Sequence, residues 1–142
     1  MRPHFPTRSV ALLRNINKRN LTDRCIIWWM KPGARTDDGD YPEVKTIEFT
    51  DVECRLAPLD LRVPFEANIA QQFGTDAKWI VIFEAGRFIP GNRRLVVSGI
   101  TKDTVWQIHL EVLGEIFTDQ EMYHRVACST LSDVKAQQFN GS

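Results

Sequence analysis

The chain has 142 residues, of which 43% are hydrophobic and 25% charged, and its 18 basic and 18 acidic residues give a formal net charge of zero. That length suits one domain, with a core large enough to need neither disulfides nor a metal. The balanced charge argues against a protein that holds nucleic acid by bulk positive charge, although it leaves room for a local basic patch.

Residues 1–22 are predicted to form an N-terminal arm followed by a short helix from Ser9 to about Lys18. One side of this helix is basic. A solvated surface is the favoured interpretation, and contact with a neighbouring subunit or with DNA is the alternative.

A β-rich domain is expected over residues 23–117. Its first strand, residues 23–31, contains Trp28 and Trp29, and it leads into a polar hairpin loop over residues 31–42. The acids of that loop lack the glutamate and flanking helices of a calcium-binding EF-hand. The second strand, residues 45–59, changes its alternation near Thr50 and Asp51, which predicts a β-bulge.

Residues 62–74 are predicted to form an inserted helix, because Phe65, Ile69 and Phe73 recur at intervals of four and Gly74 suits a C-cap. Residues 78–99 follow as two apolar strands joined through a Pro90-Gly91 turn. A last strand over residues 103–117 places His109 on its polar face as an exposed imidazole.

Residues 118–142 are expected to form a short helix that runs to Val126 and then an extended, mobile tail. The fold class is therefore mainly β, a small antiparallel barrel or sandwich with one inserted helix.

The three cysteines are odd in number, form no CxxC pair and lie at no ligand spacing from the histidines. We expect free thiols in a reducing compartment, with Cys25 and Cys54 buried in strands. No metal or other cofactor is expected. No apolar run approaches the roughly 20 residues that span a bilayer, so we expect a soluble protein with no membrane partner.

No catalytic motif is present: there is no G-x-S-x-G elbow, P-loop, GxGxxG or HExxH sequence. The paired acids Asp37 and Asp38 lie in an exposed loop, where nothing would raise a carboxyl pKa into a useful range. We therefore expect a structural or binding protein rather than an enzyme.

Four ordered pieces of the sequence resemble one family. They are CIIW at 25–28 before TDDG at 36–39, DVECRLAP at 51–58, WIVIF at 79–83 before IPGNRRL at 89–95, and VVSG at 96–99 before WQIHLEV at 106–112. The third resembles an I-x-x-G-D-R-L turn, with Asn92 where aspartate is commoner. This pattern resembles the head–tail connector proteins of tailed bacteriophages, which are known as head-completion, stopper or head–tail joining proteins.

The resemblance implies a small β-barrel that forms a ring of its own copies beneath the portal and adaptor, closes the DNA channel and docks the tail. It implies a virion protein at the head–tail junction, made in the host cytoplasm, with transient contact to packaged DNA and no cofactor. A tail-terminator ring is an alternative in the same part of the virion. A nucleic-acid-binding barrel of the OB type is the rival class.

Three sets of candidate residues follow from these hypotheses. The candidate channel loop comprises Arg35, Asp37, Asp38 and Asp40. The candidate intersubunit contacts are Trp28, Trp29, Phe65, Ile69 and Phe73. The candidate basic patch, which an OB-type barrel would use, comprises Arg87, Arg93 and Arg94.

Overall fold

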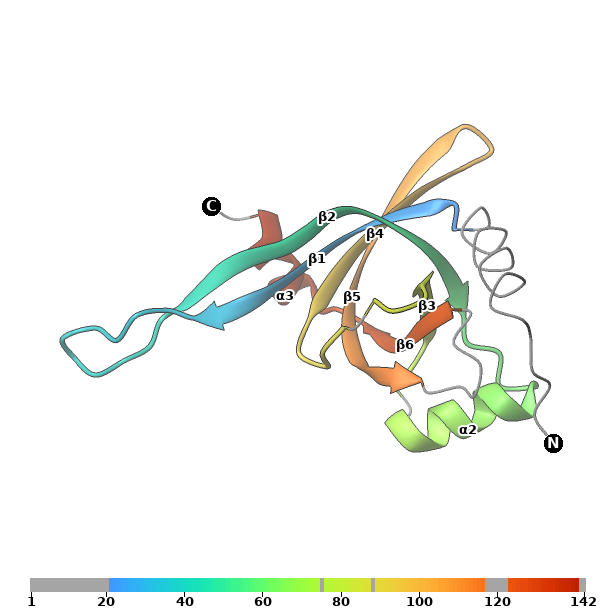
Figure 1. Cartoon of the computed structure of the whole chain (residues 1–142), viewed down its shortest axis with the longest axis horizontal. Coiled ribbons are helices and arrows are strands. Elements are labelled where there is room, and N and C mark those ends of the chain that lie inside the picture. Colours follow the sequence, from blue (N-terminus) through green and yellow to red (C-terminus); the bar gives the residue numbers. More distant parts are fainter. Residues whose placement is uncertain (1–20, 75, 88, 117–122, 141–142) are drawn as a thin grey trace.

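The computed structural model describes residues 21–74, 76–87, 89–116 and 123–140. Six antiparallel strands form a closed barrel in the order β1-β2-β3-β6-β5-β4, with β4 returning to β1 (Figure 1). The predicted mainly β fold, an antiparallel barrel with an inserted helix, is confirmed. The predicted helix from Ser9 to Lys18 lies outside the described residues.

In the described part of the chain, the helix α2 lies between β2 and β3, and the helix α3 follows the last strand. The bounds of the described elements are β1 Asp23–Pro32, β2 Glu43–Pro58, α2 Pro64–Phe73, β3 Trp79–Glu84, β4 Arg94–Thr101, β5 Thr104–Ile116, β6 Tyr123–Thr130 and α3 Asp133–Asn140.

The barrel interior is filled by alternate side chains of all six strands, as a pleated sheet with one buried face requires. In β5, Leu110 and Val112 are fully buried and Trp106 and Ile108 pack against them, so the predicted alternation of this strand is confirmed. The interior is made by Cys25, Ile27, Val52, Cys54, Val81, Phe83, Ile89, Leu95, Val97, Leu110, Val112, Val126 and Cys128.

The predicted bulge in β2 is also confirmed. Cys25 pairs with Val52 but Ile27 pairs with Phe49, so β2 holds an extra residue at this point. Asp51 adopts a φ of 53°, a left-handed conformation that is compatible with aspartate. The irregularity separates the part of β2 that belongs to the barrel from the part that extends beyond it.

The two strands predicted as a pair over residues 78–99 do not pair with each other. β3 lies between β2 and β6, whereas β4 lies between β1 and β5. The turn at Pro90 does exist, because the Arg93 N–H donates to the Pro90 carbonyl at 3.2 Å. It belongs to a connection that crosses the barrel, and that connection buries Ile89 in the core.

The expectation of a helix to Val126 and a mobile tail is wrong for residues 123–140. Tyr123–Thr130 is a strand of the barrel that pairs with β3 on one side and with β5 on the other, and Val126, Ala127 and Cys128 are fully buried. The helix α3 follows and packs on the outside of the barrel (Figure 1). The barrel closes through this segment, since β6 is the strand that joins β3 to β5.

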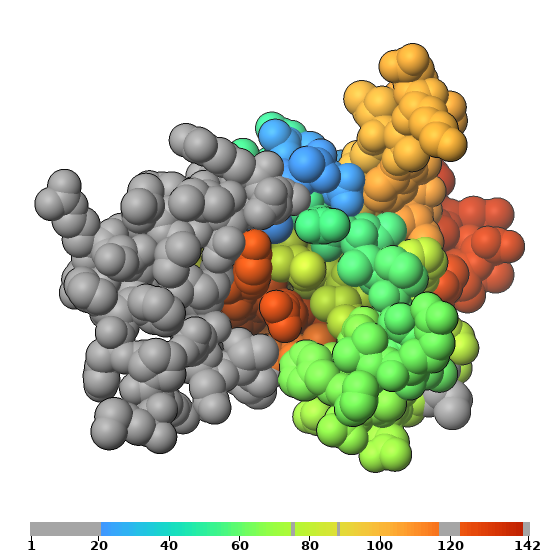
Figure 2. Space-filling model, turned by 90° about the vertical axis from the view of Figure 1, so that its right-hand side faces the viewer, coloured from blue at the N-terminus to red at the C-terminus, as the bar shows by residue number. Residues whose placement is uncertain are grey.

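The inserted helix α2 is confirmed close to its predicted bounds. Pro64 occupies the first turn, and Gly74 ends the helix with a φ of 95° while its N–H donates to the Ala70 carbonyl at 2.9 Å. Ile69 and Phe73 pack on the barrel wall over β3 and β6. Figure 2, viewed from the α2 side, shows this helix and the tip of the β4–β5 hairpin as projections from the body of the molecule.

Candidate functional site

A two-stranded ribbon projects from the barrel. This β1–β2 arm, residues 29–50, begins where β1 stops pairing with β4 at Trp28, and β2 starts pairing with β3 only at Cys54 (Figure 1). Within the described part of the chain, the two strands of the arm therefore pair only with each other, and their outer edges pair with no other strand. Free strand edges are a template for pairing with another chain.

The tip of the arm is an ordered turn held by its backbone. The Gly39 N–H donates to the Thr36 carbonyl at 2.9 Å, and the Thr36 N–H donates to the Asp40 carbonyl at 2.8 Å. Gly39 has a φ of 86°, and the Arg35 guanidinium lies against it. This turn brings together the four candidate channel residues, all of them exposed: Arg35, Asp37, Asp38 and Asp40.

Large apolar side chains are exposed along the same arm. The exposed fractions are 60% for Tyr41, 53% for Val44, 44% for Ile47 and 47% for Phe49. The sequence pattern did not single these residues out, because their alternation resembles that of a core strand. They are exposed because this half of β2 extends past the barrel.

The three residues of the candidate basic patch all contact other side chains of the chain. The Arg93 guanidinium lies 3.7 Å from the centroid of the Trp29 ring, and its Nε lies 2.7 Å from a Glu48 carboxylate oxygen. Arg94 donates to the Gln138 side chain at 2.7 Å and stacks over another tryptophan, and Arg87 lies over Phe49. Each of the three arginines is therefore engaged by a side chain of the same chain, which leaves less of its guanidinium available to a nucleic acid than the sequence suggested.

Two of the candidate intersubunit residues are buried within their own chain. Trp28 is 0% exposed beneath Phe139 of α3, with ring centroids 5.3 Å apart. Ile69 is 3% exposed on the face of α2 that packs against the barrel. In this fold neither reaches the surface, which corrects their assignment. Phe73 and Trp29 are partly buried, and Phe65 remains 45% exposed.

His109 also differs from its expected exposure. It lies in β5 beneath α3, with its ring centroid 5.9 Å from that of Phe139, and its Nδ1 is buried without a hydrogen-bond partner. The helix α3 thus covers both Trp28 and this imidazole.

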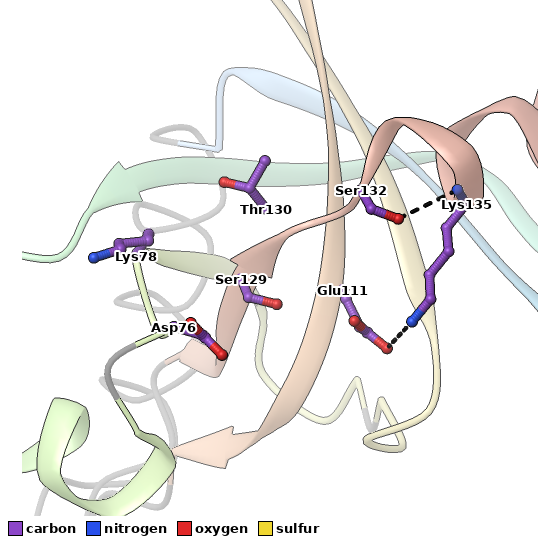
Figure 3. A pocket seen from close by; sticks show the side chains of 7 residues that line it. All are labelled: Asp76, Lys78, Glu111, Ser129, Thr130, Ser132 and Lys135. Carbon is purple, nitrogen blue, oxygen red and sulfur yellow. Dashed lines mark hydrogen bonds and ion pairs between the residues drawn. The ribbon is translucent and has the colours of Figure 1, made fainter.

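A polar hollow of about 390 Å³ lies where β6 runs into α3 (Figure 3). Lys135 links two parts of it, because its Nζ lies 3.8 Å from a Glu111 oxygen and its N–H donates to the Ser132 hydroxyl at 3.4 Å. The lining mixes acids, lysines and hydroxyls without a histidine or cysteine: Asp76, Lys78, Glu111, Ser129, Thr130, Ser132 and Lys135. This set does not pair a hydroxyl nucleophile with an imidazole base.

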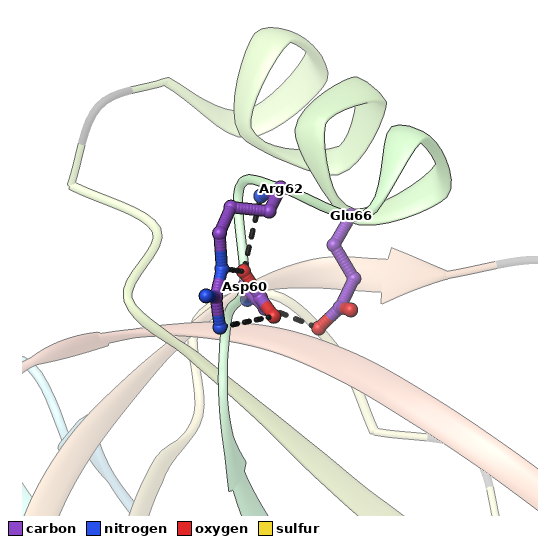
Figure 4. A network of polar contacts seen from close by, with 3 residues as sticks. All are labelled: Asp60, Arg62 and Glu66. Carbon is purple, nitrogen blue, oxygen red and sulfur yellow. Dashed lines mark hydrogen bonds and ion pairs between the residues drawn. The ribbon is translucent and has the colours of Figure 1, made fainter.

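A more apolar hollow of about 600 Å³ lies between α2 and the barrel, lined in part by Leu59, Leu61 and Ala70. A polar network fixes the chain beside it (Figure 4). Asp60 accepts hydrogen bonds from the Arg62 side chain and N–H, which lower the pKa of its carboxyl, and the Asp60 N–H donates to Glu66 at 3.2 Å. These contacts hold the entry of α2.

An acid–imidazole pair lies at the start of β6. His124 Nε2 is 2.8 Å from Glu115 Oε1, and the same oxygen accepts the Ile89 N–H at 3.0 Å. Because this carboxylate also holds the backbone of the connection before β4, we interpret the pair as structural.

The three cysteines are free and buried in the barrel. A hydrogen bond with Cys54 and burial raise the pKa of the Cys25 thiol, and burial raises the pKa of the Cys128 thiol. Neutral buried thiols are poor nucleophiles. Among the described residues no group of three or more His, Cys, Asp or Glu is arranged to hold a metal ion, and no helix is long and apolar enough to cross a membrane.

Comparison with models of protein families, with curated proteins and with solved structures gives no match for this chain.

Proposed function

We propose that this chain is a structural subunit of the head–tail connector of a tailed bacteriophage. Its copies form a ring below the portal and adaptor, close the DNA channel and dock the tail. The observation that carries the proposal is the β1–β2 arm, which projects from a closed barrel and presents exposed apolar side chains behind an acidic tip. A closed barrel has few free edges of its own, so a projecting ribbon is the element suited to contact other subunits.

The chemistry of the tip supports a place at the DNA channel. Asp37, Asp38 and Asp40 are exposed on a turn that the backbone holds. Carboxylates repel phosphates, so a ring of such tips would narrow the channel without gripping the genome. This is the behaviour expected of a plug that must release DNA.

The OB-type alternative loses its main support. Such a barrel needs free basic and aromatic side chains on one sheet face. Here Arg93 is stacked on Trp29 and paired with Glu48, and Arg94 is engaged with α3. The tail-terminator alternative predicts a different place in the virion, at the head-proximal end of the tail.

Location and loss of function test the proposal together. The protein is tagged in the phage that encodes it, and virions and tailless heads are imaged by electron microscopy. We expect density at the head–tail junction, and deletion should yield filled heads that leak DNA and lack tails. Absence of the protein from the junction overturns the proposal. Its presence on free tails, with overlong tails after deletion, supports the terminator instead.

A further inference from the structure

Charged residues are unevenly distributed along the chain. Residues 1–20 contain five of the 18 basic residues and none of the 18 acidic ones, so the remaining chain carries a formal charge of −5. The basic residues of this N-terminal segment are Arg2, Arg8, Arg14, Lys18 and Arg19. Opposite charges on two parts of one sequence favour contact between those parts.

The β1–β2 arm has complementary properties. Residues 29–50 contain five acidic and three basic residues, a formal charge of −2. Four of the acids gather at and beside the tip and are exposed: Asp37, Asp38, Asp40 and Glu43. Val44 pairs with Lys31 and Ile47 pairs with Trp28. Because these two pairs differ in parity along the strand, the exposed Val44 and Ile47 lie on opposite faces, and both faces of the arm carry apolar surface. An isolated two-stranded ribbon is marginally stable in water, and burying such side chains against a partner stabilises it.

The sequence of the N-terminal segment matches both properties. Besides its five cations it contains Val10, Leu12, Leu13 and Ile16. We infer that residues 1–20 of one copy bind the β1–β2 arm of a neighbouring copy. This inference rests on the ring assembly proposed above, but it assigns the acidic tip to the contact between copies instead of to the channel lumen.

The direction of β1 favours binding of residues 1–20 to the arm of a neighbouring copy over binding to the arm of their own chain. Residue 21 lies at the barrel end of β1, and the arm begins at the other end of this ten-residue strand (Figure 1). A strand of that length spans about 33 Å, so the segment would have to double back along its own strand to reach its own tip. A copy that gives its segment to one neighbour and receives one from the other forms a head-to-tail contact, which closes into a ring.

DNA is the competing ligand for a basic segment. Phosphates would satisfy its cations but would leave its four apolar side chains and the arm without a partner. The acidic, partly apolar arm satisfies both, and we therefore favour it.

Charge exchange between the two parts tests the inference in the full-length protein. The arm variant is Asp37→Lys/Asp38→Lys, at the two central positions of a turn held by backbone hydrogen bonds. The segment variant is Arg14→Glu/Lys18→Glu. The control is Gln71→Lys/Gln72→Lys/Thr104→Lys/Gln107→Lys, which adds as much positive charge as the arm variant at exposed positions outside the arm. Sedimentation velocity and mass photometry at low salt measure assembly.

We expect the wild type and the control to assemble and each variant alone to lose at least tenfold in association. An equimolar mixture of the two variants should assemble again, because each arm then meets a segment of opposite charge, and one chain carrying both sets of changes should also assemble. These results would support the inference.

Four outcomes would overturn it. Assembly of both single variants at the wild-type level would show that the arm is not the contact, and the ring proposal would stand. Recovery in the fourfold-changed chain but not in the mixture would place the segment on its own arm. Unchanged assembly of the segment variant with weakened DNA binding in a salt titration would assign the segment to DNA. A wild type that stays monomeric at every concentration would reject both the ring and the inference.

Discussion

Arg93 stacks on Trp29, with its guanidinium carbon 3.7 Å from the ring centroid, while its Nε lies 2.7 Å from Glu48. The arginine side chain is 13% exposed and the glutamate 25%. The contact joins the connection before β4 to the base of the β1–β2 arm. Arg93, which the sequence suggests as a residue that contacts nucleic acid, instead connects the barrel to the β1–β2 arm.

Replacing this arginine should destabilise the fold. Arg93→Ala removes a stacked cation and leaves Glu48 partly buried without its partner, so we expect a loss of about 2–3 kcal/mol in the free energy of unfolding. Urea denaturation followed by circular dichroism measures the change. Arg93→Lys keeps the charge but loses the planar stacking, so its free energy of unfolding should lie between those of the wild type and Arg93→Ala.

The matched control is Arg62→Ala. Arg62 pairs with Asp60 at 3.1 Å, but its side chain is 91% exposed. Exposed pairs contribute about 0–1 kcal/mol, so this substitution should change stability little. Equal losses in the two variants would mean that the Arg93 contact gains nothing from its burial.

Sequence patterns predicted the local elements of this fold better than their partners. The bulge near Asp51 and the helix α2 follow from parity and from spacing, which are properties of neighbouring residues. The strand β6 was missed because its first half follows a helix-capping pattern and its second half, Ala127–Thr130, is made of small residues. Ala127 is fully buried beneath α2, beside Ile69. Small side chains there allow a helix to lie close to the sheet, yet in the sequence they resemble a polar tail.

A second close approach tests how α2 is seated. An added Cβ at Gly114 would lie 2.5 Å from Cε1 of Phe73. Gly114→Ala should therefore push the ring outward and cost about 1–2 kcal/mol. Faster hydrogen exchange of the amides of α2 would report the displacement.

A compensating change provides the control. Phe73→Leu shortens the side chain that meets the new methyl group, so Gly114→Ala should cost less in the Phe73→Leu background than in the wild type. Additive losses in the double variant would show that the two residues do not meet.

The candidate site was predictable only in part, for a related reason. The acidic tip was found because four polar residues between two strands define a loop on their own. The exposure of Ile47 and Phe49 was not predicted, because the alternation of side chains does not show where a long strand leaves the barrel. Trp28 was placed at a subunit contact because its cover, Phe139, lies 111 positions further along the chain.

The burial of Trp28 depends on the ring of Phe139 in α3. The helix α3 has eight residues and is too short to be stable alone. Its Phe139 packs on Trp28, and the Phe139 carbonyl accepts a hydrogen bond from Lys45 at 2.8 Å. Phe139→Ala should cost about 2–3 kcal/mol and should make Trp28 accessible to acrylamide, measured by tryptophan fluorescence quenching.

Val134→Ala is the control on the same helix. Val134 is 74% exposed, so its truncation should change stability by less than about 0.5 kcal/mol and leave the quenching unchanged. If Phe139→Ala and Val134→Ala behave alike, α3 does not cover the tryptophan.

The buried thiols predict a loss of stability in alkali. Burial raises the pKa of Cys128 well above its ordinary value of 9.0. Above about pH 9 the unfolded chain releases this proton while the folded chain keeps it, so the unfolded state binds fewer protons and stability falls as pH rises. The contribution is fully present below the unfolded pKa and is lost progressively toward the folded one. The slope is about 1.4 kcal/mol per pH unit for each such thiol.

Cys128→Ala isolates this contribution from other groups that titrate in alkali. Denaturant unfolding of both proteins between pH 7.5 and 10.5 should give a constant difference in free energy at the lower end. Above about pH 9 the variant should lose stability less steeply than the wild type, by about 1.4 kcal/mol per pH unit. A thiol reagent should meanwhile label none of the three cysteines until denaturant is added, because all three lie in the core. Parallel curves across the whole range, or labelling of Cys128 in the folded protein, would contradict a buried, neutral thiol at this position.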